Sequence, residues 1–97
     1  MAGQIRATPE QLRARSAEYG QKAQDISQII AGLDRLIQQL QDEFEGQAAQ
    51  AFQSQYQDIR PSFVRGQEMT ESLSQQTAQM AQNFEDLDTQ MAGSLRG

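Results

Sequence analysis

The 97-residue chain contains no cysteine, no histidine and no tryptophan. Without cysteine, disulfides and thiolate metal sites are excluded. Without histidine there is no serine–histidine pair, no imidazole ligand and no side chain that ordinarily titrates near neutral pH. Hydrophobic residues make up only 37% of the chain, and its longest apolar stretch, residues 29–33, is far shorter than the roughly 20 residues of a membrane span. These absences argue against an enzyme, a metal, a cofactor or a transmembrane segment, and they favour a small helical protein that acts through its surface.

Positive charge is also scarce. Eight Lys and Arg residues stand against 13 Asp and Glu residues, which gives a formal net charge of -5. Phosphate backbones are bound by clustered Lys and Arg, and here the basic residues are scattered, so nucleic acid is not an expected partner. The first residues, 1–6, are not followed by an apolar segment, so we expect no Sec-type signal peptide. The length suits one domain, residues 1–97.

A long amphipathic helix is predicted over about residues 8–43, after a short arm. Thr8-Pro9-Glu10-Gln11 is a helix start, with Thr as N-cap, Pro in the first turn and Gln to complete a capping box. From there the apolar positions alternate at spacings of four and three, which places them in one narrow stripe. This stripe consists of Leu12, Ser16, Tyr19, Ala23, Ile26, Ile30, Leu33, Ile37, Leu40 and Phe44.

A second helix is predicted over about residues 47–92, after a turn at 44–46 in which Gly46 is the natural left-handed residue. Its stripe consists of Phe52, Tyr56, Ile59, Phe63, Gly66, Thr70, Leu73, Thr77, Met80, Phe84, Leu87 and Met91. Pro61 removes a backbone hydrogen bond, so we expect a kink near it, or alternatively a break into two helices. Gly93 and Gly97 lead us to expect a flexible tail over residues 93–97.

The two helices predict an all-α fold, an antiparallel helical hairpin in which the stripes face each other. The first helix, however, has more apolar residues than one partner helix can cover. Burying a large aliphatic side chain contributes about 1.5–3 kcal/mol, so we expect two hairpins to dimerise into an elongated four-helix bundle. The expected interface consists of Ile26, Ile29, Ile30, Leu33, Leu36, Ile37 and Leu40. The alternative is that Ile29 and Leu36 are ordinary surface hydrophobic residues.

Two acidic runs are the candidates for acid–base chemistry. One contains Asp42, Glu43 and Glu45, and the other contains Glu85, Asp86 and Asp88. Paired carboxylates act as acid and base only where a cleft separates their pKa values, and a hairpin with an apolar interior offers no such cleft. We therefore interpret both runs as solvated acids and predict no catalytic or metal-binding residue.

The chain resembles the WXG family, the early-secretory-antigen-like substrates of the type VII (ESX/Ess) secretion system of Gram-positive bacteria and mycobacteria. The resemblance rests on the length, the two amphipathic helices and the central Phe44-Glu45-Gly46. Phe44 stands where the family has Trp, so the aromatic bulk is kept while the indole N–H donor is lost. The opening residues 8–13, Ser16, Tyr19-Gly20 and the later Ile59-Arg60-Pro61 also resemble members from Firmicutes.

The resemblance implies a secretion signal near the end of the second helix. The pattern described for Firmicutes members is hydrophobic-xxx-Asp/Glu-xx-hydrophobic-xxx-hydrophobic, and it is matched by Phe84, Asp88, Met91 and Leu95. This spacing puts all four on one helix face, where a groove can recognise them. Alternatively, Phe84 and Met91 are simply the last positions of the apolar stripe.

The function implied by the resemblance is that of a secretion substrate, made in the cytoplasm of a Gram-positive-type bacterium and secreted as a folded dimer without a Sec signal. It would act as an effector or as a co-secreted partner. The implied partners are a second copy of the chain, or a related small helical protein in a heterodimer, and the type VII secretion ATPase. The alternative is a cytoplasmic helical adaptor or chaperone that pairs with a larger helical toxin-domain protein.

Overall fold

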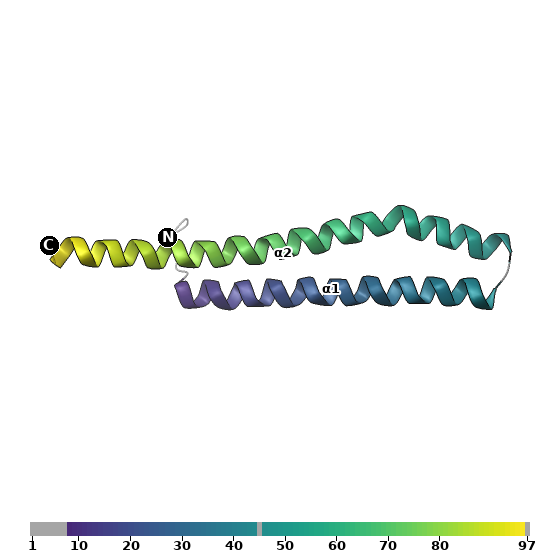
Figure 1. Cartoon of the computed structure of the whole chain (residues 1–97), viewed down its shortest axis with the longest axis horizontal. Helices are drawn as coiled ribbons and strands as arrows, with labels where there is room; N and C mark the ends of the chain where they lie inside the picture. Colours follow the sequence, from purple (N-terminus) through teal and green to yellow (C-terminus); the bar gives the residue numbers. More distant parts are fainter. Residues whose placement is uncertain (1–7, 45, 97) are drawn as a thin grey trace, which may run out of the picture.

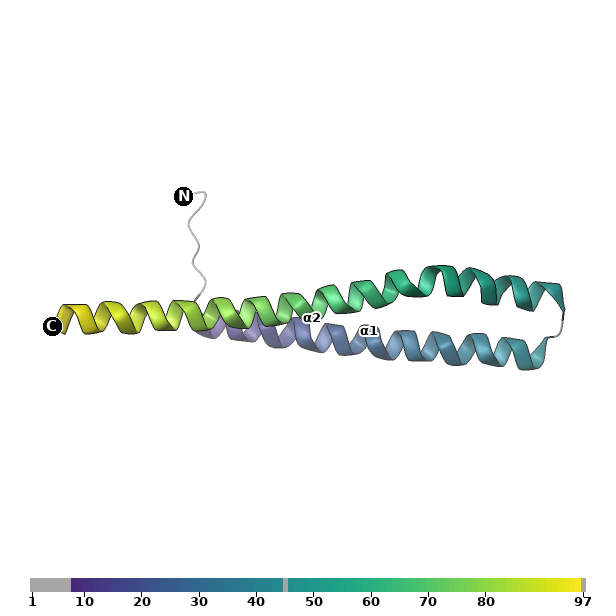
Figure 2. The same cartoon turned by 45° about the horizontal axis from the view of Figure 1, so that its top comes forward.

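Two long helices account for almost all of the structure. The computed structural model describes residues 8–44 and 46–96, with side chains described as far as residue 93. Helix α1 runs over Pro9–Glu43 and α2 over Gln47–Arg96. The helices lie side by side and antiparallel, and α2 projects beyond the start of α1 (Figures 1 and 2). The predicted all-α hairpin is therefore confirmed, with principal-axis extents of 76 × 25 × 16 Å.

Helix α1 begins with the predicted capping box. The Thr8 hydroxyl accepts a hydrogen bond from the Gln11 backbone N–H at 3.1 Å, and the Gln11 side chain accepts one from the Thr8 N–H at 3.0 Å. At the other end, Phe44 has extended backbone geometry and its N–H donates to the Leu40 carbonyl. Gly46 has a φ of 120°, a conformation in which only glycine is unstrained. Local sequence thus determines where α1 starts and how the turn is made.

Helix α2 differs from the prediction in where it ends. It continues unbroken through Pro61, and Figure 1 shows it bending in its first half. It also continues through Gly93 to Arg96, so the expected helix end near 92 was wrong, while the flexibility of this end stays a prediction. A single glycine costs a helix only about 1 kcal/mol, which does not outweigh the helix-forming residues on both sides. Neither helix, as far as it is described, has an apolar segment long enough to cross a membrane.

The seam between the helices is made mainly of small and polar side chains. The Ser16 hydroxyl donates to the Ser74 carbonyl oxygen, and the Ser74 hydroxyl donates to the Ser16 carbonyl oxygen, each at 2.7 Å. A Cβ on Gly20 would lie 3.3 Å from the Ser74 hydroxyl. The buried hydrophobic residues are Leu12, Ala23, Ile30, Ala49 and Ala81. Three of these five are alanines, so the helices approach closely at the expense of a large apolar core.

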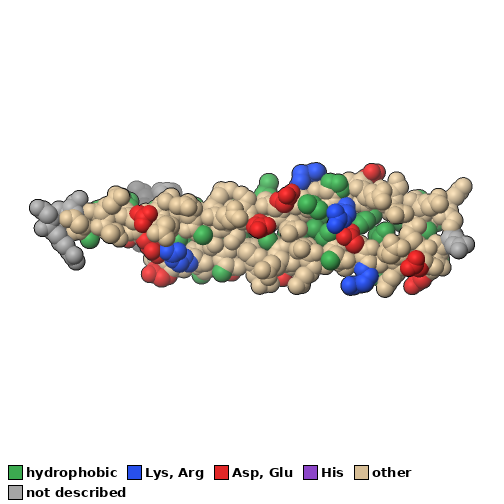
Figure 3. Space-filling view, in the orientation of Figure 1, with side chains coloured by type: hydrophobic (Ala, Val, Ile, Leu, Met, Phe, Trp, Pro, Cys, Tyr) green, Lys and Arg blue, Asp and Glu red, His purple; other side chains and the backbone are tan. Residues whose placement is uncertain are grey.

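The prediction that the whole apolar stripe of α2 faces α1 was wrong, because α2 is rotated about its own axis relative to that arrangement. The residues of α2 that turn towards α1 include Ala49, Gln53, Tyr56, Arg60, Gln67, Ser74 and Ala81. Eight of the twelve positions of the predicted stripe are instead exposed. Among them, Phe52, Ile59, Leu73, Met80 and Leu87 each have 40–54% of the residue accessible. The seam excludes these large side chains because the backbones are too close for them. Figure 3 shows hydrophobic side chains still at the surface, most of them in the turn half of the hairpin.

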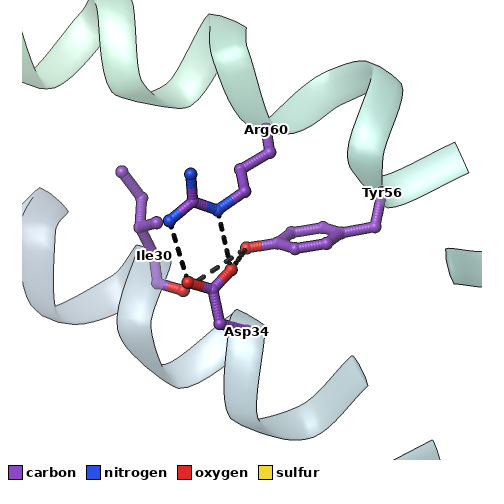
Figure 4. Close-up of polar contacts among 4 residues, drawn as sticks. All are labelled: Ile30, Asp34, Tyr56 and Arg60. Carbon is purple, nitrogen blue, oxygen red and sulfur yellow. Dashed lines mark hydrogen bonds and ion pairs between the residues drawn. The ribbon is translucent and has the colours of Figure 1, made fainter. Parts of the chain in front are cut away.

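A polar cluster joins the helices near the bend of α2 (Figure 4). The Arg60 guanidinium donates through Nε and Nη2 to the two oxygens of Asp34, both at 2.9 Å. The Tyr56 hydroxyl donates to Asp34 Oδ1 at 2.5 Å and lies 3.3 Å from the Ile30 carbonyl oxygen. We call Asp34, Tyr56 and Arg60 the clamp. Its two-pronged geometry fixes direction as well as distance.

The clamp shifts the acidity of its members. Hydrogen bonds from Arg60 and then from Tyr56 lower the pKa of Asp34 to about 2, from an ordinary value of 3.8. Burial, followed by the hydrogen bond to Asp34, raises the pKa of Tyr56. The hydrogen bond to Asp34 also raises the pKa of Arg60. The carboxylate, the guanidinium and the protonated phenol are therefore the forms that the fold stabilises.

Replacing Gly46 should destabilise the turn. We expect Gly46→Val to lower the free energy of unfolding by about 1–3 kcal/mol, the range for a strained backbone position. Apart from its chain neighbours, no described residue has an atom within 4 Å of the new Cβ, so the cost comes from φ and not from a clash. Gly93→Ala, at a helical glycine with equally open surroundings, is the matched control and should not destabilise. Urea denaturation measures both, and an unchanged midpoint for Gly46→Val would contradict the prediction.

Because of the clamp, the free energy of unfolding should decrease at low pH. The pKa of Asp34 is lower in the folded chain than its ordinary value, so its stabilisation is fully present above about pH 4 and is lost as the pH falls towards 2. The unfolding free energy of the wild type should therefore approach that of Asp34→Asn over this window. Arg60→Gln should show the same convergence. Urea denaturation near neutral pH and at about pH 2.5, at one protein concentration, tests this, and a constant difference would refute it.

Candidate functional site

One long face of the hairpin carries large apolar side chains from both helices. On α1 they are Ile26, Ile29, Leu33, Leu36, Leu40 and Phe44, and on α2 they are Phe52, Ile59, Phe63, Met69, Leu73, Met80, Leu87 and Met91. We call this set the apolar face. By helical spacing its members lie to one side of the seam on each helix. A surface of this length and composition is typical of a site that binds another protein.

Two cavities open on the apolar face, between the helices. The first, which we call the turn cavity, has a volume of about 290 Å³ and is lined by Leu40, Phe44, Ala48, Ala49 and Phe52. The second, which we call the belt cavity, has a volume of about 300 Å³ and is lined by Ile26, Ile29, Ile30, Ser62, Phe63 and Gly66. Gly66 has no side chain to fill the belt cavity. Both are recesses into which apolar side chains of a partner can fit.

The other side of the seam is different in chemistry. A groove of about 590 Å³ lies there, lined by Ala17, Gly20, Gln21, Ala23, Gln24, Ser27, Gln67, Glu71, Ser74 and Gln75. Amide, hydroxyl and carboxylate groups dominate this lining, and they are well solvated. The hairpin therefore has one face suited to water and one suited to a protein partner.

The predicted dimer interface falls partly on the apolar face. Ile29 and Leu36 are 60% and 58% exposed, whereas Ile26, Leu33, Ile37 and Leu40 are half-buried. Ile30 is only 5% exposed, so it packs inside the hairpin and has little surface to offer a second copy. Ile30 lies on the line of α1 that faces α2, and it also lines the belt cavity, so its place in the interface stays a prediction.

The predicted turn motif lies at the end of the apolar face. Phe44 is exposed and lines the turn cavity, and Gly46 makes the turn. Glu45 lies outside the described residues. Phe44 thus offers an aromatic surface at the tip of the hairpin.

The predicted export signal lies at the opposite end. Phe84 is half-buried, while Asp88 and Met91 are exposed on the part of α2 that projects past α1. The side chain of Leu95 lies outside those described. Asp88 and Met91 of the predicted signal are therefore accessible to another protein, while Phe84 is partly covered.

The acidic runs lie in solvent. Asp42, Glu43, Asp86 and Asp88 are exposed, and Glu85 pairs with Arg13 at 2.7 Å. Sequence reasoning missed the clamp, although Asp34 is the single acid within the aliphatic stretch 26–40. Its partners are identifiable only once the facing positions of the two helices are known.

Comparisons with known proteins agree with this architecture. Residues 4–89 match the WXG100 family model, described as proteins of 100 residues with WXG. Protein YukE of Bacillus subtilis (strain 168) is 37% identical over 97 residues, which cover the whole of both chains. Type VII secretion system extracellular protein A of Staphylococcus aureus (strain USA300) is 31% identical over 91 residues, 94% of each chain.

The fold also matches a solved structure, that of EsxA from Geobacillus thermodenitrificans in crystal form I. The TM-score is 0.88 at 39% identity, over 95% of this chain and 99% of that one. The family model, the relatives and the fold all span nearly the full length of the hairpin. The chain therefore belongs to the WXG100 family.

Proposed function

We propose that the protein is a small substrate of a type VII secretion system, exported as a folded helical homodimer without a Sec signal. Outside the cell it acts as an effector or co-secreted partner through protein–protein contacts, and it has no catalytic role. The relatives named above support the link to secretion. The observation that carries the proposal is the apolar face, because a hairpin with a closed seam still exposes large side chains of both helices.

Self-association follows from the cost of leaving this face in water. Burial of each large apolar side chain contributes about 1.5–3 kcal/mol. Ile29 and Leu36 are more than half exposed, as are Phe44 and Phe52. A second hairpin is the partner that offers a matching apolar surface, and packing two hairpins face to face makes an elongated four-helix bundle.

The pair of substitutions Ile29→Asp and Leu36→Asp should convert the dimer to monomer and lower its melting temperature. The physical reason is that each places a charge where the partner would bury an apolar group. Gln28→Asp with Gln39→Asp adds the same charge at exposed positions of α1 and should leave the dimer intact. Sedimentation equilibrium at tens of micromolar measures the mass, and a monomeric wild type would refute the dimer.

Export requires a feature that the secretion machinery can recognise on a folded protein. Phe84, Asp88 and Met91 lie on one side of the projecting end of α2, and Leu95 continues the same spacing. A helix with apolar anchors at this spacing docks in a hydrophobic groove. A basic residue in that groove would pair with Asp88. We assign the groove to the secretion ATPase.

Asp88→Ala together with Leu95→Ala should reduce the protein in the culture supernatant while its level in cells stays normal. Alanine is a good helix former, and Asp88 is exposed, so folding should be unaffected. Asp86→Ala with Gln90→Ala, on the other side of α2, is the matched control. Immunoblots of the culture supernatant and of the cells measure export, and circular dichroism checks folding. Normal secretion of the first variant would place the signal elsewhere.

A second candidate function is that of an adaptor that pairs with a larger helical protein. It is favoured by the extent of the apolar face on α2, where Leu73, Met80 and Leu87 continue past the aliphatic stretch of α1. Such a stripe suits an additional helix. A monomeric wild type in sedimentation, which would refute the homodimer, would favour this function.

A further inference from the structure

Three of the four methionines lie on one line of α2. They are Met69, Met80 and Met91, whereas Met1 lies outside the described residues. Successive members are eleven residues apart, which is about three helical turns, so their side chains leave the helix on the same side. The accessible fractions of the three residues are 68%, 44% and 57%, respectively. Small molecules in solution can therefore reach each of these thioethers.

Methionine is the side chain of this protein that a mild oxidant attacks most readily, because the chain has no cysteine, histidine or tryptophan. Hydrogen peroxide reacts with an accessible thioether in one step. The O–O bond breaks, one oxygen atom bonds to the sulfur, and the other leaves as water. Sulfur loses two electrons to the peroxide, and the side chain becomes a methionine sulfoxide, which is polar.

Two of the three methionines supply much of the apolar surface near the end of α2. The large apolar side chains between residues 78 and 93 are Met80, Phe84, Leu87 and Met91. Phe84 is half-buried and the other three are exposed. Ser74 faces Ser16, so the later residues of α2 lie level with the first turns of α1 or beyond them (Figure 1). Met80 and Met91 thus lie away from the predicted dimer interface on residues 26–40.

Oxidation at these two positions changes binding and leaves the fold intact. A sulfoxide on Met80 or Met91 stays in water in the folded hairpin, because both side chains are exposed. A groove that binds the end of α2 would instead have to bury the sulfoxide oxygen, and burying a polar group without a hydrogen bond is unfavourable. Loss of one apolar anchor in this way weakens docking by roughly tenfold or more.

We propose that Met80 and Met91 are an oxidation-sensitive switch in the recognition surface of α2. With both thioethers intact, the end of α2 docks through its apolar anchors. With either one converted to the sulfoxide, docking is lost while the hairpin stays folded. Met91 belongs to the predicted export signal, so this inference rests on the proposed function and specifies how its recognition site is regulated. A methionine sulfoxide reductase reverses the change, as two thiols become a disulfide and the oxygen leaves as water.

Treatment of the purified protein with hydrogen peroxide tests the chemistry. Peptide mass spectrometry should show that Met80 and Met91 each gain one oxygen atom, at rates close to that of free methionine. The oxidised protein should elute earlier from a phenyl hydrophobic-interaction column, and its urea midpoint should not change. Slow reaction of both methionines, or unchanged elution of the oxidised protein, would overturn the inference.

Two leucine variants show which methionines cause the change in elution. Met80→Leu with Met91→Leu keeps the apolar volume and removes both sulfur atoms, so peroxide should shift its elution much less than that of the wild type. Met69→Leu is the matched control and should still shift. A full shift in the first variant would assign the effect to Met69 and refute the switch at residues 80 and 91.

Export tests the consequence for recognition. Glutamine resembles methionine sulfoxide in size and polarity, so Met80→Gln with Met91→Gln should lower the amount of protein in the culture supernatant several-fold, with a normal level in cells. Met80→Leu with Met91→Leu should be secreted normally. Circular dichroism of both variants checks folding, and normal secretion of a folded glutamine variant would contradict the inference.

The variant Asp88→Ala with Leu95→Ala separates this inference from the proposed function. If that variant is retained in cells while the glutamine variant is secreted, the predicted export signal is supported and the oxidation switch alone is refuted. If both variants are secreted normally, the predicted signal and the switch are both refuted.

Discussion

The close approach of α1 and α2 is the constraint on which the other features depend. Ser16 and Ser74 hydrogen-bond to each other's backbone, and Gly20 leaves no room for even a methyl group without displacing its neighbour. Alanines fill much of what remains of the buried interior. Since dispersion and burial scale with side-chain size, this seam stabilises the hairpin modestly. The large apolar residues are consequently turned outward, and the hairpin alone leaves its main source of hydrophobic stabilisation unused.

Much of the hairpin could be predicted from sequence because its signals are local. Four residues specify the capped start of α1, Gly46 identifies the turn, and the 4-3 spacing identifies two helices. The rotation of α2 could not be predicted in this way. Its stripe contains two adjacent lines of apolar residues, and the choice between them depends on Ala49, Ser74 and Ala81 fitting against α1. That fit is a property of pairs of residues far apart in sequence.

The difference between local signals and long-range fits also explains which residues of the candidate site could be identified from the sequence. Ile29 and Leu36 flank the stripe in the sequence and are exposed in the structure, so their role as candidates could be inferred from periodicity. Ile30 differs from Ile29 by one position, a rotation of about 100° on a helix, and this places it inside. Asp34 and Arg60 were missed because each alone resembles an ordinary surface charge. Near the bend of α2 these two residues share two hydrogen bonds. The hydrogen bonds fix the relative position of the two helices more specifically than apolar contacts alone would.

The unequal length of the two helices has a consequence for binding kinetics. The last described turns of α2 extend past α1, and residues 86–93 are all exposed. A helical segment of this length has little intrinsic stability without tertiary contacts. A partner that binds it therefore contributes free energy to hold it helical, which lowers the affinity for a given contact area. Binding of this kind combines a specific side-chain pattern with rapid release.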